Sequence, residues 1–336
     1  AKAIVSDGKG ILAADESAPT IKKRFDGIGV ESNEANRQVY RSMLFTTSGA
    51  ADFVSGIILF DETIRQQSVD GRSMVKVIQD GGMIPGIKVD KGAKPLANRP
   101  NETVTEGLDG LRDRCIEYSN LGARFAKWRA VIRIGDGIPS QTCIETNAHA
   151  LARYAAICQE TGLVPIVEPE VLMDGSHDIN TCDSVTEETL RAVYQELYEQ
   201  RVVLEGTLLK PNMIVSGSTC QQQASVDEVA ARTIACLKRA VPAAVPGIVF
   251  LSGGQTEEVA TAHLNAMNTR TEDTPWQLSF SYGRALQASA LAVWKGEPGN
   301  ITLAQKNLYR RAKLNSLARN GAYSSQLETD LADAET

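Results

Sequence analysis

Charged residues at the ends of apolar segments are the features of this sequence best suited to chemistry. Lys210 follows the apolar segment 204–209 and is followed by Pro211 and Asn212, a pattern typical of a buried strand that ends at a loop. An apolar environment disfavours the ammonium form and can lower a lysine's pKa from ~10.4 toward neutrality, where the free amine attacks carbonyls. We therefore predict a nucleophilic lysine at position 210, against the alternative of a strand-end lysine that extends into solvent.

Further charged residues close other apolar segments in the same way: Asp15, Lys88 with Asp90, Lys127 with Arg129, and Glu168 with Glu170. Residues i and i+2 of a strand point to one face, so Lys127 with Arg129, and Glu168 with Glu170, can each point inward together. Gathering such charges at one place costs free energy unless they neutralise one another or serve a reaction. We favour a catalytic site over a structural ion-pair network, which would also perturb pKa values.

The elements that must position these residues form a repeating pattern. Eight apolar segments end in polar or glycine-rich clusters, at 10–17, 55–62, 84–92, 124–132, 163–170, 204–212, 247–254 and 277–284. Their spacing of about 30 to 45 residues leaves room for a crossover helix after each strand. This rhythm predicts an α/β fold, a (β/α)8 TIM barrel in a single domain, and it favours that barrel over a doubly wound open sheet.

Helical patterns fill several of the intervals. We expect helices at 101–120, 147–161, 186–200, 225–240 and 302–320, and the sequence Ser-Val-Asp-Glu from Ser225 predicts a capping box. No linker interrupts the alternation, so residues 1–323 are assigned to the barrel domain. The small, acidic segment 324–336 is expected to be a flexible tail.

Two glycine-bearing turns predict a phosphate site. The sequences LSGGQ (251–255) and SYGRALQ (281–287) fall after the seventh and eighth strands, where barrels bind phosphate with backbone N–H groups and a helix N-terminus. The groups available there are Ser252, Gly253, Gly254, Ser281, Gly283 and Arg284. A second cationic patch is formed by Ser17, Arg24, Lys88 and Arg129. Two anion sites on either side of Lys210 indicate a substrate with a phosphate at each end and a ketone between them.

Composition argues against several other classes of protein. The formal net charge of −6 and the lack of a long basic run argue against a nucleic-acid surface. No run of ~18 apolar residues predicts a membrane-spanning helix. The six dispersed cysteines favour reduced thiols in a cytosol-like compartment. The three histidines lack metal-binding spacing, and no dinucleotide or P-loop motif occurs, so we predict no metal and no such nucleotide site.

The sequence resembles the class I, Schiff-base-forming fructose-bisphosphate aldolases over nearly its whole length. The segments that carry the resemblance are GILAADES, GIKVDKG, ARFAKWR, LARYA, LVPIVEPE, LEGTLLKPNM, FLSGGQ and FSYGRALQAS. The resemblance implies reversible cleavage of fructose 1,6-bisphosphate to dihydroxyacetone phosphate and glyceraldehyde 3-phosphate, in glycolysis and gluconeogenesis. It implies no cofactor, a cytoplasmic homotetramer and, as a family expectation only, contact with actin or another cytoskeletal partner.

The resemblance also implies roles for individual residues. Lys210 is then the Schiff-base lysine, Glu168 the acid and base of carbinolamine dehydration, and Asp15 the base for the C4 hydroxyl. Lys127 is the cation between Lys210 and the reacting hydroxyl, and Glu170 helps to balance the charge. The C1-phosphate site comprises Ser252, Gly253, Gly254, Ser281, Gly283 and Arg284, and the C6 side comprises Ser17, Arg24, Lys88 and Arg129.

Two departures from the family pattern affect these expectations. The family's DESTGS loop reads DESAPT here, and Pro19 removes an N–H while Thr20 keeps a hydroxyl. The last tyrosine is Tyr323, so the terminal tyrosine that assists enamine proton exchange in the family has no counterpart in residues 324–336. A transaldolase-like or single-phosphate sugar aldolase, and a scaffold protein with incidental catalysis, remain the alternative functions.

Overall fold

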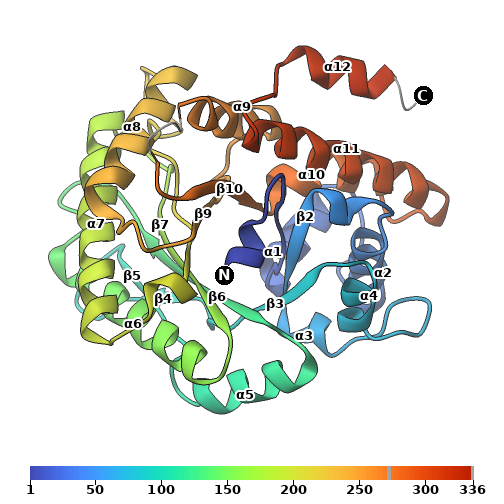
Figure 1. The fold of residues 1–336 in the computed structure, drawn as a ribbon, viewed down its shortest axis with the longest axis horizontal. Coiled ribbons are helices and arrows are strands. Elements are labelled where there is room, and N and C mark those ends of the chain that lie inside the picture. Colours follow the sequence, from blue (N-terminus) through green and yellow to red (C-terminus); the bar gives the residue numbers. More distant parts are fainter. Residues whose placement is uncertain (271–273, 334–336) are drawn as a thin grey trace.

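The chain forms a closed barrel of eight parallel strands surrounded by helices (Figure 1). The computed structural model describes residues 1–270 and 274–333, with side chains through residue 331. The barrel strands are β1 (Gly10–Ala14), β2 (Val54–Leu59), β3 (Ile84–Lys88), β6 (Phe125–Ile132), β7 (Val164–Val171), β8 (Leu208–Leu209), β9 (Gly247–Phe250) and β10 (Gln277–Tyr282). Each pairs with its neighbours in chain order, and β1 closes the ring by pairing with β10. The predicted TIM barrel is confirmed.

Apolar side chains fill the barrel interior. One buried cluster contains Ile11, Ile58, Phe125, Ile166 and Val249, which come from five different strands. Phe125 lies opposite Gly86 of β3, where a Cβ would come within 2.2 Å of the ring, so glycine makes room for this aromatic side chain.

The N-terminal turn packs into the same cluster. The 3₁₀ helix η1 (Lys2–Val5) contributes Ile4 and Val5 to the interior. Figure 1 shows this turn at the centre of the ring of strands. The barrel is therefore a packed core, and its charged residues lie at the other end, beyond the carboxyl ends of the strands.

Helices cover the outside of the barrel. They are α1 (Ala18–Asp26), α2 (Glu34–Phe45), α3 (Asp61–Ile64), α4 (Met74–Asp80), α5 (Leu111–Leu121), α6 (Gln141–Glu160), α7 (Ile179–Glu199), α8 (Val226–Ala240), α9 (Glu257–Asn268), α10 (Arg284–Trp294), α11 (Ile301–Arg319) and α12 (Gln326–Asp333). The N-cap predicted at Ser225 is confirmed, because its hydroxyl accepts a hydrogen bond from the Glu228 N–H at 3.2 Å. None of the described helices is long and apolar enough to cross a membrane.

Three segments differ from the sequence expectation. The helix expected at 101–120 begins at Leu111, because Thr103–Thr105 (β5) pairs with Ala93–Pro95 (β4) and Gly107 and Gly110 have positive φ angles. The strand expected from residue 204 is reduced to Leu208–Leu209, because Leu204–Gly206 forms a 3₁₀ turn (η3). Within the segment expected to be a flexible tail, residues 326–333 form α12, and residues 334–336 lie outside the described part of the chain.

Side-chain bonds hold α12 against the barrel domain. Glu328 accepts hydrogen bonds from both terminal nitrogens of Arg311, at 2.8 and 2.9 Å, and one from the Tyr323 hydroxyl at 3.0 Å. Arg311 is buried, so an ion-pair partner on α12 helps to offset the cost of its desolvation.

Candidate active site

A cavity of about 1330 Å³ lies at the carboxyl ends of the barrel strands. Every residue that the sequence predicted for the site lines it. Asp15 directly follows β1, Lys88 ends β3, and Lys210 follows β8, while β6 and β7 each contribute an i, i+2 pair. Segments that are far apart in the sequence are therefore brought to one place by parallel strand pairing.

Lys210 leaves its short strand within a buried environment. Its backbone N–H donates to the Val167 carbonyl at 2.8 Å and so continues the β7–β8 ladder past Leu209. The residue is 4% exposed, and its Nζ lies 3.1 Å from Glu168 Oε1. The predicted position at a strand's exit is confirmed, and the alternative of a lysine extending into solvent is wrong.

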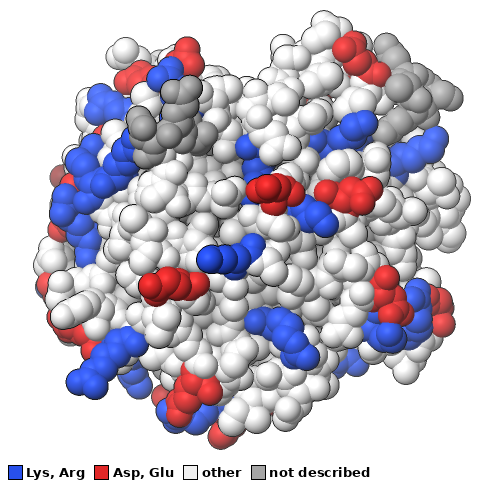
Figure 2. Space-filling view, in the orientation of Figure 1, with Lys and Arg blue, Asp and Glu red and all other residues white. Residues whose placement is uncertain are grey.

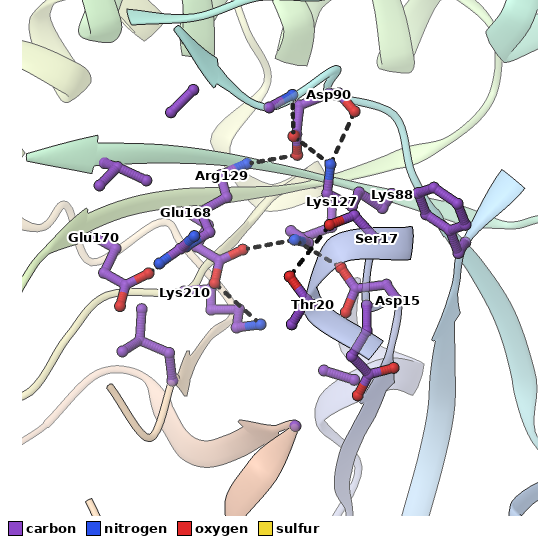
Figure 3. Close-up of a pocket in the computed structure, with 18 of the residues that line it drawn as sticks. Asp15, Ser17, Thr20, Lys88, Asp90, Lys127, Arg129, Glu168, Glu170 and Lys210 are labelled. Carbon is purple, nitrogen blue, oxygen red and sulfur yellow. Dashed lines mark hydrogen bonds and ion pairs between the residues drawn. The ribbon is translucent and has the colours of Figure 1, made fainter. Parts of the chain in front are cut away.

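Four charged side chains form a continuous series in the floor of the cavity (Figure 3). Lys210 pairs with Glu168, Glu168 Oε2 lies 3.1 Å from Lys127 Nζ, and Lys127 Nζ lies 2.7 Å from Asp15 Oδ2. The series alternates cation and anion, so each buried charge has an opposite neighbour.

The pKa values of this series follow from burial and charge. Burial opposes the charged form of Asp15, but Lys127 and Lys210 outweigh it and hold the pKa of that carboxyl well below its usual range. Burial likewise opposes ionisation of Glu168, and the nearby cations still lower its pKa. The pKa of Lys127 is raised despite burial, because Asp15 and Glu168 stabilise its ammonium. Lys127 is therefore a permanent cation between two carboxylates.

Glu168 has an oxygen available for a further hydrogen bond. Its Oε2 is buried and has no hydrogen-bond partner among the described residues, although it lies within ion-pair distance of Lys127. A buried carboxylate oxygen of this kind can exchange a proton with a ligand in the cavity.

Two more ion pairs lie along the side of the cavity formed by β3, β6 and β7. Arg129 Nε donates to Glu170, and Lys88 Nζ donates to the Asp90 carboxylate and, at 2.9 Å, to the Asp90 carbonyl. Asp90 also accepts the N–H of Arg129 at 3.1 Å. Asp90 therefore fixes Lys88 relative to β6; the sequence analysis listed it among the charged residues at strand ends but gave it no role in the reaction. The i, i+2 spacing from Lys88 is the signal that could have identified it.

The loops after β9 and β10 form an anion-binding region. Gly253 and Gly254 have φ angles of +56° and +99°, and a Cβ at position 254 would lie 3.2 Å from Arg284 Nη2. Arg284 begins α10, so the N-terminus of that helix faces the same region. The Ser281 hydroxyl is buried there without a hydrogen-bond partner among the described residues. These groups together can bind a phosphate.

Arg24 lies beside this region, next to Gly283, whereas the sequence analysis grouped it with Ser17, Lys88 and Arg129. A Cβ at Gly283 would lie 3.5 Å from Arg24 Nη2. The Arg24 guanidinium also donates to Glu16, whose carboxylate accepts from Gln287 Nε2 at 3.0 Å. The sequence analysis did not foresee the contact with Gly283, because it depends on how α1 is placed against the loop after β10.

Pro19 is compatible with the turn that leads into α1. It occupies the first turn of the helix, where its missing N–H is not needed for an intrahelical bond. Ser17 is the N-cap residue, and its hydroxyl lies 3.2 Å from that of Thr20. Two hydroxyl groups therefore lie together at the edge of the cavity, and Ser17 and Thr20 both line it.

Comparison with known proteins identifies the family of the chain. The family model described as "Fructose-bisphosphate aldolase class-I" matches residues 1–336. The chain belongs to the class-I fructose-bisphosphate aldolase family. It has the function of a glycolytic aldolase, a carbon–carbon lyase.

Individual relatives of this aldolase are similar over nearly their whole length. A "Probable fructose-bisphosphate aldolase class 1" from Xanthomonas campestris is 63% identical over 324 residues, which cover 96% of this chain and 97% of the relative. "Fructose-bisphosphate aldolase 4, cytosolic" from Arabidopsis thaliana is 56% identical over 95% of this chain and 81% of its own. The solved aldolase of Plasmodium falciparum, in complex with TRAP and a small-molecule inhibitor, has a TM-score of 0.95 at 50% identity and covers 96% of this chain and 94% of its own.

Among residues 1–270 and 274–331, no group of three or more His, Cys, Asp or Glu side chains is arranged to hold a metal ion. His149 pairs with Glu196 on the surface, and His263 is buried against Gln255.

Proposed function

We propose that this aldolase cleaves fructose 1,6-bisphosphate reversibly through a Schiff base on Lys210, with residues 1–323 as the catalytic domain. The observation that carries the proposal is the buried series Lys210, Glu168, Lys127 and Asp15, in which N···O distances are 3.1, 3.1 and 2.7 Å. In this series the nucleophile lies next to an acid–base group, and that group lies next to a cation and a second carboxylate. This arrangement meets the geometric requirements of amine catalysis on a ketone.

The first step is addition of the Lys210 amine to the C2 ketone. Glu168 takes a proton from the protonated Lys210 nitrogen to free the amine, and after attack a second nitrogen proton moves to the former carbonyl oxygen, which becomes the carbinolamine hydroxyl. Glu168 then returns its proton to that hydroxyl so that water leaves, and one proton stays on the nitrogen. The product is an iminium, whose positive nitrogen can accept an electron pair from the neighbouring carbon. The unpartnered Oε2 of Glu168 supports this role, because it can accept and donate the proton without breaking a hydrogen bond.

The second step breaks the C3–C4 bond. Asp15 takes the proton of the C4 hydroxyl, the C3–C4 electron pair moves to the iminium nitrogen, and glyceraldehyde 3-phosphate leaves with an enamine remaining on Lys210. The lowered pKa of Asp15 keeps it ionised and ready to accept this proton. Lys127 lies beside Asp15 and stabilises negative charge on the reacting hydroxyl. Protonation and hydrolysis of the enamine then release dihydroxyacetone phosphate.

Two anion-binding regions position the substrate. We assign the C1 phosphate to Ser252, Gly253, Gly254, Ser281, Gly283 and Arg284, with Arg24 added beside Gly283. The C6 phosphate is assigned to Ser17, Lys88 and Arg129. Glu170 balances the charge of Arg129 and keeps its guanidinium at the edge of the cavity.

A kinetic comparison tests the substrate assignment. If both regions bind phosphate, kcat/KM for fructose 1,6-bisphosphate should exceed that for fructose 1-phosphate, and Lys88→Met should remove most of the difference. Equal values for the two sugars would favour the alternative of a single-phosphate aldolase. Absence of cleavage for both would favour a scaffold protein.

The assembly and location of the protein are further parts of the proposal. Membership of the family supports a homotetramer, and the name of the Arabidopsis relative supports a cytoplasmic location. Binding to actin or another cytoskeletal protein is proposed on the family expectation alone. Sedimentation velocity tests the assembly, because a tetramer has four times the mass of the 36.2 kDa chain.

A further inference from the structure

The loop between β9 and α9 presents backbone N–H groups to the cavity. No hydrogen-bond acceptor is found within the described chain for the N–H groups of Ser252, Gly253 and Gly254, and all three residues line the cavity. The N–H groups can meet one anion only while the two glycines keep their positive φ angles. Loops deform more easily than helices or strands, so contacts from neighbouring residues are needed to hold the Ser252–Gly254 loop in this conformation.

Gln255 closes this loop on itself. Its backbone N–H and its side-chain Nε2 both donate to the Ser252 carbonyl, at 3.0 and 2.9 Å. Two donors on one carbonyl fix the orientation of the peptide between Ser252 and Gly253, and so direct the N–H of Gly253. Gln255 is 8% exposed, so water does not readily replace either bond.

His263 determines how the Gln255 amide is oriented. It lies two turns along α9, is 5% exposed, and places Nδ1 2.6 Å from Gln255 Oε1. The amide oxygen can only accept, so Nδ1 carries the hydrogen. Burial lowers the pKa of His263 to about 4, which keeps the ring neutral. A reversed amide would place its oxygen against the Ser252 carbonyl oxygen, so a single arrangement satisfies both contacts.

We propose that His263 is a positioning residue for phosphate binding, which acts through Gln255 to hold the Ser252–Gly254 loop in its anion-binding conformation. The proposal rests on the proposed function, because it assigns a supporting residue to the phosphate region of that site. His263 does not touch the substrate. It fixes the Gln255 amide, which in turn fixes the Ser252–Gly254 loop. Loss of His263 should therefore affect substrate affinity more than the chemical step.

Replacing His263 distinguishes an effect on phosphate binding from an effect on the chemical step. In His263→Leu the donor is lost and the apolar bulk is kept, so we expect KM for fructose 1,6-bisphosphate and the inhibition constant of inorganic phosphate each to rise about tenfold, the effect of losing one buried hydrogen bond. The value of kcat should stay within about twofold of wild type, because Lys210 and Glu168 are untouched. His263→Asn should restore both constants, since an amide nitrogen can replace Nδ1 as the donor.

A matched control and a second measurement make the outcome decisive. His149→Leu, which removes a surface histidine paired with Glu196, should leave KM unchanged. Nitrogen-15 NMR of the wild-type protein should show His263 as the Nδ1–H tautomer, a measurement that does not depend on whether a variant folds.

An unchanged KM in a folded His263→Leu variant, a loss confined to kcat, or an Nε2–H tautomer would each overturn the proposal. Borohydride trapping of wild type tests the proposed function separately, because it reports on Lys210 and not on this loop.

Discussion

At the scale of single residues, the active site depends on charges that are buried but paired. Lys127 has carboxylates on two sides, at 2.7 and 3.1 Å, and is 3% exposed. A buried cation in this position can stabilise negative charge on a reacting hydroxyl because water does not screen it. The same burial makes each member of the series sensitive to loss of its neighbour.

Removing the proton acceptor should stop cleavage without preventing covalent attachment. In Asp15→Asn the side chain keeps its shape but cannot accept the C4 hydroxyl proton, so kcat should fall about 10²- to 10⁴-fold. Borohydride in the presence of dihydroxyacetone phosphate should still trap an adduct, because Lys210 and Glu168 remain. A coupled cleavage assay and intact-mass measurement check the two parts. Retention of cleavage near the wild-type rate would exclude Asp15 as the base.

Removing the central cation should destabilise the fold as well as the reaction. Lys127→Met leaves Asp15 and Glu168 buried without their shared partner, which should lower the free energy of unfolding by about 3–5 kcal/mol. The matched control is Lys76→Met, since the Lys76 side chain is 61% exposed and its pair with Asp80 should contribute less than about 1 kcal/mol. Urea denaturation measures both variants. Equal losses in the two would contradict the account of a buried, paired site.

Much of the site was predictable at this scale, and the exceptions have a common cause. Strand periodicity placed Lys127 with Arg129 and Glu168 with Glu170 because backbone geometry alone sets which way these side chains point. The place of Arg24 beside Gly283 was not foreseen because it depends on the path of α1, and the Gln255–His263 contact was missed because an amide's orientation depends on its three-dimensional surroundings. Local sequence carries neither kind of information.

At the scale of elements, the ends of the strands carry the reacting side chains, and the helices that follow carry residues that position them. Helix α9 carries His263, which is bonded to the Gln255 amide next to the phosphate loop. Burial lowers the pKa of this histidine to about 4, whereas an unfolded histidine titrates near ~6.5. Protons therefore bind the unfolded chain more readily than the folded one between these two pH values.

This difference predicts acid sensitivity with a definite sign. The stabilisation from a neutral His263 is fully present above pH ~6.5 and is lost as pH falls toward 4, so about 2 kcal/mol should be lost between pH 7 and pH 5. His263→Asn has no such titration, and its stability should fall less over the same interval. Urea denaturation at pH 7 and pH 5 measures the free energy of unfolding of both proteins. Subtracting the change in the variant from the change in wild type removes the contributions of the other titrating groups. Identical pH dependence in both would contradict the burial of a neutral His263.

Elements were predictable where the sequence pattern was regular and long. The eight strands were located correctly because each is an apolar segment followed by polar or glycine-rich residues. The segment 101–110 was assigned to a helix in error, since the β-branched residues Thr103–Thr105 pair with a second short strand outside the barrel. That pairing joins residues in separate segments, and periodicity within one segment does not reveal it.

At the scale of the whole molecule, a chain of net charge −6 is proposed to bind a doubly phosphorylated sugar. Basic and acidic side chains are interspersed on the face shown in Figure 2. Lys88, Arg129, Arg24 and Arg284 instead line a single cavity at the carboxyl ends of the strands. Carboxylates line the same cavity, among them Asp15, Glu168 and Glu170, so the positions of individual cations, and not the overall charge, determine where an anion can bind.

The proposed chemistry needs no metal ion, because the iminium nitrogen accepts the electrons of the broken bond. Prolonged dialysis against EDTA should leave the rate of fructose 1,6-bisphosphate cleavage unchanged. The comparison is with the same protein dialysed against buffer and assayed in parallel. A loss of activity that is restored by adding a divalent cation would show that the electron sink is not the Schiff base.

The central claim is that Lys210 carries the substrate covalently, and mapping the adduct tests it most directly. The protein is reduced with borohydride in the presence of fructose 1,6-bisphosphate, digested, and sequenced by mass spectrometry. The account predicts one modified lysine, Lys210, in wild type and no adduct at that peptide in Lys210→Ala. An adduct on Lys88 or Lys127, or trapping at the wild-type level in Lys210→Ala, would contradict it.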